Sequence, residues 1–334
     1  MLGGCIGEIF VGNKIGKRAV LLGAVAQSVP DIDIIASFWY SPSANLLAHR
    51  GFSHSFLFLI LVTPLLALLA DKWRRPHDVS FRTWLWFFGI EILVHIFLDA
   101  FNSYGTGWFE PFNDARFSFN ILFVADPLFT ILPVVVFLFL LFRRTHRQRT
   151  FWSVITIGWC CFYLGVSLVN KMVVDSDVKK VAARQGITYH RHFTTPTPFN
   201  NLLWFVVLEG DKGYYIGHRS VFDTRYSMPL YFFPRNDSLL LPVKDLADLI
   251  DLTRFSQGYY TIEQWGDTLV FNDLRFGQIT GWKDPLNHFT FHYFLKGAYS
   301  NDMVVQRGRF SNWNGETIKA LLERIAVRDP PIPK

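Results

Sequence analysis

The chain has 334 residues, of which 50% are hydrophobic, 17% are aromatic and only 18% carry a charge. Soluble globular proteins usually contain about 25% charged residues, so this composition argues against an ordinary cytosolic enzyme and also against disorder. Three cysteines are too few for a small disulfide-stabilised scaffold. The net charge of +6 is not gathered in a patch interleaved with aromatic residues, so no nucleic-acid partner is expected.

Charge is unevenly distributed along the chain. Residues 1–170 contain 13 Lys and Arg and 10 Asp and Glu, whereas residues 171–334 contain 20 and 17. The length allows about two domains. We therefore expect a membrane-embedded helical domain over residues 1–170 and a soluble α+β domain over residues 171–334.

The chain begins with two short apolar stretches, Leu2–Gly12 and Ala19–Val29, on either side of a basic turn at residues 14–18. Each is too short to cross a membrane, so this pattern favours an N-terminal helical hairpin. Asp126 is expected to cap a later helix at its N-terminus, with Pro127 in its first position. Four longer apolar stretches are expected to be spanning helices: Phe52–Ala70, Thr83–Phe101, Pro127–Phe142 and Phe151–Val169.

The charges between the expected spans predict the orientation. Residues 72–82 and residues 143–149 form two basic loops, which favour the cytoplasmic side of a membrane. This assignment leaves residues 30–51, residues 102–126 and everything after Asn170 on the outer side. The prediction is a multi-pass protein of the inner (plasma) membrane with a periplasmic C-terminal domain.

After Thr188 the sequence changes to short β-rich runs separated by turn signals such as residues 210–213. Two helical stretches, Val243–Thr253 and Glu316–Ala326, interrupt them. An α+β outer domain with mainly antiparallel strands is expected. The expected strands are Leu202–Glu209, Tyr214–Ser220, Pro229–Phe233, Tyr259–Glu263, Thr268–Asn272 and His288–Leu295.

Three ionisable residues interrupt one of the expected spans. Glu91, His95 and Asp99 are four residues apart, so they lie on one face of a helix that is otherwise apolar. An ionisable group at membrane depth costs about 2.5–3.5 kcal/mol, and such groups are retained where they meet a partner, a metal or water. Packing through hydrogen bonds between helices is the alternative explanation.

Two further motifs carry metal-binding side chains. His49 and His54 flank a flexible Gly51 at the start of an apolar helix, and imidazole is the commonest metal ligand in proteins. Asp31 and Asp33 follow the hairpin, where an extended backbone would point both carboxylates toward one ion. Histidines at a membrane boundary and a solvated acidic loop are the alternative explanations.

In the topology predicted from loop charge, these motifs meet at the outer end of the spans. Nitrogen and carboxylate oxygen ligands suit Zn²⁺ best, with Mn²⁺ or Fe²⁺ as alternatives. A metal with an open position activates water, which implies hydrolysis of a phosphoester or related bond at the membrane surface. Glu91, Arg50 and Asp33 are the candidate catalytic residues, with Arg50 expected to hold an anionic group. The candidate ligands are Asp31, Asp33, His49, His54, His95 and Asp99.

The ordered set of motifs resembles a known family. The pattern His-Arg-Gly-Phe-Ser-His-Ser at residues 49–55, together with Pro-Asp-Ile-Asp at 30–33 and His-x-x-x-Asp at 95–99, is similar to the YdjM/YfhP-type membrane-bound metal-dependent hydrolases. Some members are described as LexA-binding proteins of the inner membrane. The resemblance covers about residues 1–170 and implies a membrane-bound, metal-dependent hydrolase. Family members usually begin with several more residues, which leaves open whether the true N-terminus lies upstream of Met1.

Two other functions remain open from the sequence. The first alternative is a non-catalytic membrane protein whose outer domain binds a partner or an envelope component. The second is an ion or proton path built on the Glu91, His95 and Asp99 stripe, although neighbouring spans lack matching charges. Membrane lipid is the expected partner and a lipid-linked or phosphorylated molecule the expected substrate; the sequence leaves its identity and the oligomeric state open.

Overall fold

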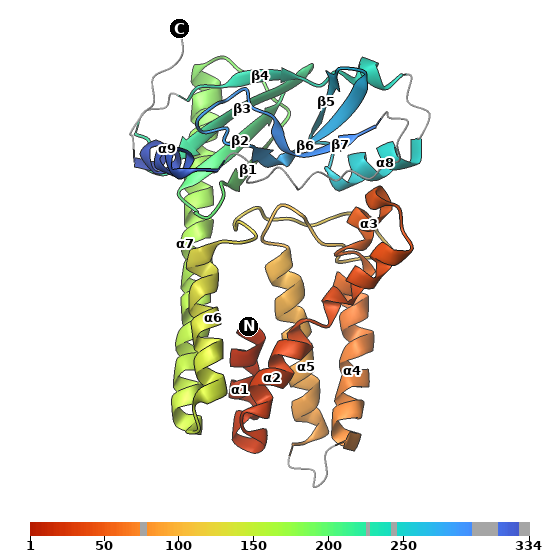
Figure 1. Ribbon diagram of the computed structural model, residues 1–334, viewed down its shortest axis with the longest axis vertical. Coiled ribbons are helices and arrows are strands. Elements are labelled where there is room, and N and C mark those ends of the chain that lie inside the picture. Colours follow the sequence, from red (N-terminus) through yellow and green to blue (C-terminus); the bar gives the residue numbers. More distant parts are fainter. Residues whose placement is uncertain (74–78, 225–227, 242–245, 296–312, 327–334) are drawn as a thin grey trace. The chain divides into compact units, whose positions relative to one another are not determined.

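A computed structural model describes residues 1–73, 79–224, 228–241, 246–295 and 313–326 (Figure 1). The chain divides into two compact units, and each is described by itself. Unit 1 contains Met1–Trp39, Ala48–Phe119 and Val124–Val166, and unit 2 contains Tyr40–Leu47, Asn120–Phe123 and Ser167–Lys334. Arg74 and Arg75 of one basic loop lie outside the described residues, as do the start of the helix expected from Val243 and the C-terminal tail.

Unit 1 is helical, as the sequence predicts. The N-terminal hairpin is present, and the helix expected from Pro127 begins and ends where it was predicted. Asp126 caps that helix, because its Oδ1 accepts a hydrogen bond from the backbone N–H of Leu128 at 2.9 Å. The elements are α1 (Leu2–Ile15), α2 (Arg18–Gln27), η1 (Pro30–Phe38), η2 (Phe52–His54), α4 (Phe56–Trp73), α5 (Phe81–Asp99), α6 (Pro127–Phe142) and the first part of α7 (His146–Arg184).

Three helices of the described chain, α4, α5 and α7, are long and apolar enough to cross a membrane. A fourth candidate span arises if α2 and η1 count as one segment, although their axes differ by 54°. Helix α6 is apolar but shorter, with 16 residues. The expectation of a helical region with several candidate membrane spans is therefore confirmed, and by length and composition three or four such spans are present among the described residues.

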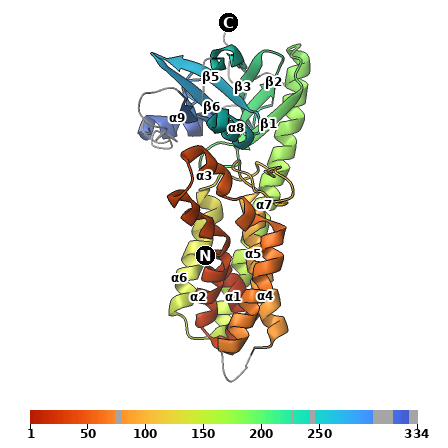
Figure 2. The same cartoon turned by 90° about the vertical axis from the view of Figure 1, so that its right-hand side faces the viewer.

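The hairpin of α1 and α2 packs among the longer helices of unit 1, and Figures 1 and 2 show it between α5 and α6. Its residues Val11 and Ala26 share a buried cluster with Trp84 and Phe87 of α5. On its other side Cys5 packs in a second buried cluster with residues of α6. Buried apolar area on both sides holds this short hairpin in place.

Helix α7 is longer than the sequence predicts. The expected span was Phe151–Val169, but the helix continues to Arg184 and has 39 residues in all. Within unit 2 its side chains Val174, Val178 and Val181 are fully buried. Their spacing places them on one face, so packing against unit 2 explains why the helix does not end with the apolar run.

Unit 2 contains two antiparallel sheets, which confirms the expected antiparallel character. Strands β1 to β4 form one sheet and strands β5 to β7 the other. Phe205 and Leu274, one from each sheet, share a buried core. The elements are α3 (Pro42–Ala48), β1 (Arg191–Pro196), β2 (Leu203–Glu209), β3 (Gly213–Ser220), β4 (Tyr231–Pro234), η3 (Asp237–Leu240), α8 (Leu246–Phe255), β5 (Tyr260–Trp265), β6 (Thr268–Gln278), β7 (Phe289–Phe294) and α9 (Gly315–Ala326).

Candidate metal centre

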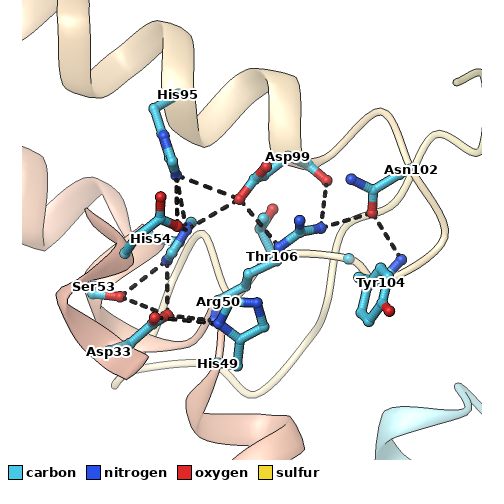
Figure 3. Close-up of polar contacts among 12 residues, drawn as sticks. Asp33, His49, Arg50, Ser53, His54, His95, Asp99, Asn102, Tyr104 and Thr106 are labelled. Atoms are coloured by element: carbon cyan, nitrogen blue, oxygen red, sulfur yellow. Dashed lines mark hydrogen bonds and ion pairs between the residues drawn. The ribbon is translucent and has the colours of Figure 1, made fainter. Parts of the chain in front are cut away.

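Four metal-binding side chains from three elements of unit 1 meet at one point. Asp31 lies in the first turn of η1 and His54 ends η2. His95 and Asp99 are one turn apart in the last part of α5. One ligand atom from each lies within 4.8 Å of the other three. Figure 3 shows the rings of His54 and His95 directed toward the carboxylate of Asp99. We call these four side chains the quartet.

The distances within the quartet match those between the ligands of one metal ion. The Nε2 atoms of His54 and His95 are 3.1 Å apart. Asp99 Oδ2 lies 3.1 Å from the first nitrogen and 3.4 Å from the second, and Asp31 Oδ1 lies 3.8 Å and 3.4 Å from them. Two ligands bound tetrahedrally to zinc at about 2.0–2.1 Å are about 3.3 Å apart. The quartet is therefore spaced so that it could hold a cation of this size.

Burial is uneven around the quartet. The side chain of His54 is fully buried, and those of His95 and Asp99 are 13% and 19% exposed. Asp31 is 50% exposed. Solvent therefore reaches the cluster from the side of Asp31.

Asp33 and Ser53 fix the orientation of the His54 ring. Ser53 Oγ lies 2.9 Å from His54 Nδ1, and Asp33 Oδ2 lies 3.3 Å from the same nitrogen. These contacts occupy the Nδ1 side, so the Nε2 side faces the quartet. Carboxylates that hold the second nitrogen of a metal-bound histidine are common in metal sites.

The structure does not bring Asp33 and His49 into the quartet. The expected extended backbone at residues 31–33 is wrong, because η1 is a 3₁₀ helix that turns the two carboxylates in different directions. Asp33 Oδ2 instead accepts hydrogen bonds from the backbone N–H of Arg50 at 2.8 Å and from Ser53 Oγ at 3.2 Å. His49 Nδ1 lies 3.2 Å from Asp33 Oδ1. Both residues thus surround His54 and do not face the other ligands.

The guanidinium of Arg50 contacts Asp99, Asn102 and Tyr104. Its Nε lies 3.1 Å from Asp99 Oδ2, and its Nη1 donates to Asn102 Oδ1 at 2.7 Å. The guanidinium also lies over the ring of Tyr104, at 5.0 Å from the centroid. The backbone of Arg50 has a φ of 61° and its carbonyl accepts from the N–H of Gly107 at 2.8 Å. In this arrangement the guanidinium anchors the carboxylate of Asp99.

The charges around the cluster favour a bound cation. The three carboxylates of Asp31, Asp33 and Asp99 all lie within 4 Å of a ring nitrogen of His54, and the Arg50 guanidinium pairs with Asp99. With the imidazoles neutral, as metal binding requires, these carboxylates carry more negative charge than the Arg50 guanidinium balances, and buried charge is costly unless it is compensated. A divalent cation would balance them.

Glu91 is fully buried on α5, one turn from His95, and lies outside the quartet. Neither carboxylate oxygen has a hydrogen-bond partner in the described part of the chain. The carboxylate is directed to the crossing of α1 and α2, because a Cβ added to Gly3 or Gly23 would lie 2.8 Å or 2.9 Å from its oxygens. The sequence thus predicted that Glu91 and His95 lie on one face of α5, but the side chain of Glu91 is directed to the hairpin of α1 and α2.

The loop after α5 contains two residues, Asn102 and Arg116, that support the site and were not predicted from the sequence. Arg116 Nη2 donates to the backbone oxygens of His49 and Gly105, each at 2.9 Å, and Asn102 holds Arg50. Arg116 is the only Lys or Arg among residues 102–126. A single cation in an aromatic loop is the signal that could have indicated this role.

The N-terminal part of the chain matches known proteins. A family model described as YdjM inner membrane protein matches residues 1–174. The inner membrane protein YbcI of Escherichia coli (strain K12) is 33% identical over 115 residues, which cover 34% of this chain and 65% of that protein. The uncharacterized protein YfhP of Bacillus subtilis (strain 168) is 30% identical over 118 residues, which cover 34% of this chain and 34% of that protein. No solved structure matches the chain.

The chain thus spans less than two thirds of the length of both relatives. The family model, by contrast, covers more than half of the chain and contains every residue of the quartet. The family inferred from the His and Asp motifs is therefore confirmed. By residues 1–174, the chain belongs to the YdjM family of inner membrane proteins.

Proposed function

We propose that this protein is an integral-membrane, metal-dependent hydrolase that acts on a phosphoester or related bond at the membrane surface. The single observation that carries the proposal is the quartet, whose donor atoms have the spacing of ligands around one cation. The family supports a location in the inner membrane. The reaction, the substrate and the outer-side position of the site are our proposals.

Each residue of the site has a proposed role. Asp31, His54, His95 and Asp99 hold the metal, with zinc favoured over manganese or iron by the tetrahedral spacing. Such a metal, when bound, lowers the pKa of a coordinated water toward about 7 and makes it a nucleophile. The half-exposed side chain of Asp31 marks the side on which water and substrate enter.

The remaining polar groups position the ligands or move protons. Asp33 holds the His54 ring, and Arg50 holds Asp99. Because the Arg50 guanidinium already contacts Asp99 and Asn102, its contribution to anion binding is through the charge that it adds beside the site. Glu91 is proposed to hold a proton in the apolar interior near His95.

Metal analysis of the purified protein tests this proposal. We expect one equivalent of divalent metal per chain, lost in His54→Ala and in Asp99→Ala. His190→Ala is the matched control, since His190 is an exposed histidine of unit 2. His49→Ala should retain the metal, because His49 lies outside the quartet. A folded wild-type protein that binds no added zinc, manganese or iron would overturn the proposal.

The activity is tested separately from the metal. The metal-loaded protein should hydrolyse members of a phosphoester panel, and a chelator or Asp99→Ala should abolish this turnover. Glu91→Gln should keep the metal and lower the rate. Metal binding without turnover of any phosphoester would contradict the reaction class.

One observation favours the alternative of a binding function in unit 2. A pocket of about 610 Å³ lies between the loop after β6 and the start of α9. Its lining combines the indole of Trp313 with polar groups of Lys283, Asp284 and Asn287. Such a lining can bind a polar envelope component by stacking and hydrogen bonds. A bound metal with no turnover, together with ligand binding lost in Trp313→Ala, would favour this function.

A further inference from the structure

The element that carries Asp31 and Asp33 has a strongly apolar outer surface. Between the two carboxylates and the end of η1, the side chains of Ile34 and Phe38 are 70% and 81% exposed. Ile32 and Ile35 are exposed as well, and so is Trp39 directly after the helix. Contiguous exposed apolar side chains mark a surface that contacts another molecule or a membrane.

This surface continues the apolar surface of a candidate membrane segment. Helix α2, which exposes Leu21 and Val25, and η1 together pass the length and hydropathy criteria of a span, with a bend of 54° between them. Helix α4, itself a candidate span, exposes Leu61 and Leu65. Helices that cross a membrane turn such faces to lipid, so lipid is the occupant that fits the adjoining surface of η1.

The distribution of charge around η1 also favours lipid over a water-soluble partner. Asp31 and Asp33 are the only charged residues of η1, and both face the cluster and not the apolar surface. No Lys or Arg lies between residues 19 and 49. A site for a water-soluble anion usually gathers its substrate through exposed cations. Here the exposed element beside the cluster is apolar, and Trp39 at its end is a residue type typical of the membrane–water interface.

We propose that η1 lies in the interfacial layer of the membrane, with Ile34 and Phe38 among lipid chains, and that the quartet acts on the phosphate ester of a membrane lipid. This inference rests on the proposed function and names its substrate class. In the reaction the oxygen of water bonds to phosphorus and the P–O bond to the lipid breaks. A proton from the water ends on the released lipid hydroxyl.

The position of η1 is tested without any activity. Spin labels are placed on Ile34→Cys and on Phe38→Cys in a Cys161→Ser background, because Cys161 is exposed whereas Cys5 and Cys160 are buried. The protein is reconstituted in phosphatidylglycerol–phosphatidylethanolamine nanodiscs, and collision with oxygen is compared with collision with a water-soluble nickel complex.

Two reference positions calibrate this measurement. Leu65→Cys on α4 reports the lipid-facing value and Gln264→Cys in unit 2 the water-facing value. We expect Ile34 and Phe38 to give preferential oxygen access close to that of Leu65. Access of both labels to the nickel complex equal to that of Gln264 would overturn the proposal, whether a soluble molecule or a partner protein then occupies the surface.

The substrate class is tested with two probes on the full-length, metal-loaded protein. The probes are phosphatidic acid in mixed micelles and p-nitrophenyl phosphate in the same detergent. Replacing Ile34 and Phe38 by serine should lower kcat/KM for the lipid by about ten-fold, since two apolar contacts are lost. Turnover of the soluble ester and metal content should stay unchanged.

The outcomes separate this inference from the proposed function. An equal loss on both probes, or no loss on the lipid, would contradict lipid recognition by η1 while leaving a metal-dependent hydrolase in place. Absence of turnover with both probes and with every other member of the phosphoester panel, in a metal-loaded wild-type protein, would contradict the proposed function instead. The spin-label result would still decide where η1 lies.

Discussion

The two nitrogens of His54 have different partners. Nε2 lies among the other members of the quartet, while Nδ1 lies beside Ser53 and Asp33. A carboxylate at Nδ1 fixes the ring and the tautomer, so the lone pair of Nε2 is directed at the metal position. In the proposed metal site, Asp33 would therefore act through His54, as a positioning residue.

Replacing Asp33 by asparagine tests this role. The substitution keeps the size of the side chain but removes the charge that holds the imidazole, so metal affinity should fall by about 10- to 100-fold. Competition with a chelating dye measures this change. Ser53→Ala is the matched variant and should have a smaller effect. Complete loss of metal, as in Asp99→Ala, would show instead that Asp33 is a direct ligand.

His218 in unit 2 makes stability depend on pH. Burial beside the ring of Phe205, together with the nearby guanidinium of Arg324, lowers the pKa of His218 from its ordinary value to about 3. The unfolded chain takes up a proton near pH 6.5, which the folded chain resists. Stability should therefore fall as pH drops from about 6.5 toward 3.

The melting temperature of the protein measures this effect. We expect the melting temperature of unit 2 in the wild type to fall between about pH 7 and about pH 5. In His218→Phe this fall should be smaller, because phenylalanine takes up no proton. Above about pH 7 the melting temperatures of the two proteins should change with pH in the same way. Identical pH profiles in the two proteins would contradict the assignment.

At the scale of elements, the hairpin of α1 and α2 depends on close backbone contact. A Cβ on Gly7 would lie 2.3 Å from the backbone oxygen of Ala19, and a Cβ on Gly23 would lie 2.1 Å from that of Gly3. Only glycine allows two helices to approach so closely without displacing their backbones. The carboxylate of Glu91 rests against the same crossing.

Gly7→Ala should therefore destabilise unit 1. The added methyl group meets backbone, which cannot move away as a flexible side chain can, so a loss of about 1–3 kcal/mol is expected. Gly158→Ala on α7 is the matched control, since nothing lies within 4 Å of its added Cβ. Denaturant unfolding in detergent measures both. An equal effect of the two substitutions would refute the close crossing.

The hydropathy of the sequence predicted the elements that begin and end where an apolar stretch begins and ends. The hairpin and α6 were predicted because turn and cap residues limit their apolar runs. The end of α7 was missed because its last turns bury only a narrow stripe against unit 2, which depends on tertiary packing. Strand β1 lies in the region expected to be β-rich but was not among the strands named, because its residues 191–196 lack the continuous apolar pattern of β2.

In the site, too, the sequence predicted what depends on residue type and spacing, but not what depends on the folded backbone. Residue types and spacing were enough to name all four members of the quartet, because helical periodicity joins His95 to Asp99 and the His-Arg-Gly motif indicates His54. The separate role of Asp33 could not be predicted, since it depends on the direction in which a 3₁₀ turn points its side chain. The location of Arg50 behind Asp99 likewise requires the folded loop.

At the scale of the molecule, the orientation in the membrane is still a prediction from loop charge. Residues 143–149 carry four arginines, which favour the cytoplasmic side, and α7 follows directly. Unit 2 would then lie on the outer side. An alkaline phosphatase fusion after Asn170 should be active and one after Arg149 inactive. The opposite pair of results would place unit 2 in the cytoplasm.

X-ray absorption at the zinc edge of the metal-loaded, full-length protein shows which side chains bind the cation. If the quartet holds the metal, we expect a first shell of nitrogen and oxygen at about 2.0–2.1 Å, with outer-shell scattering from two imidazoles that falls to one in His95→Ala. Sulfur at about 2.3 Å, or a spectrum without imidazole scattering, would contradict it, because the cation would then lie away from Asp31, His54, His95 and Asp99.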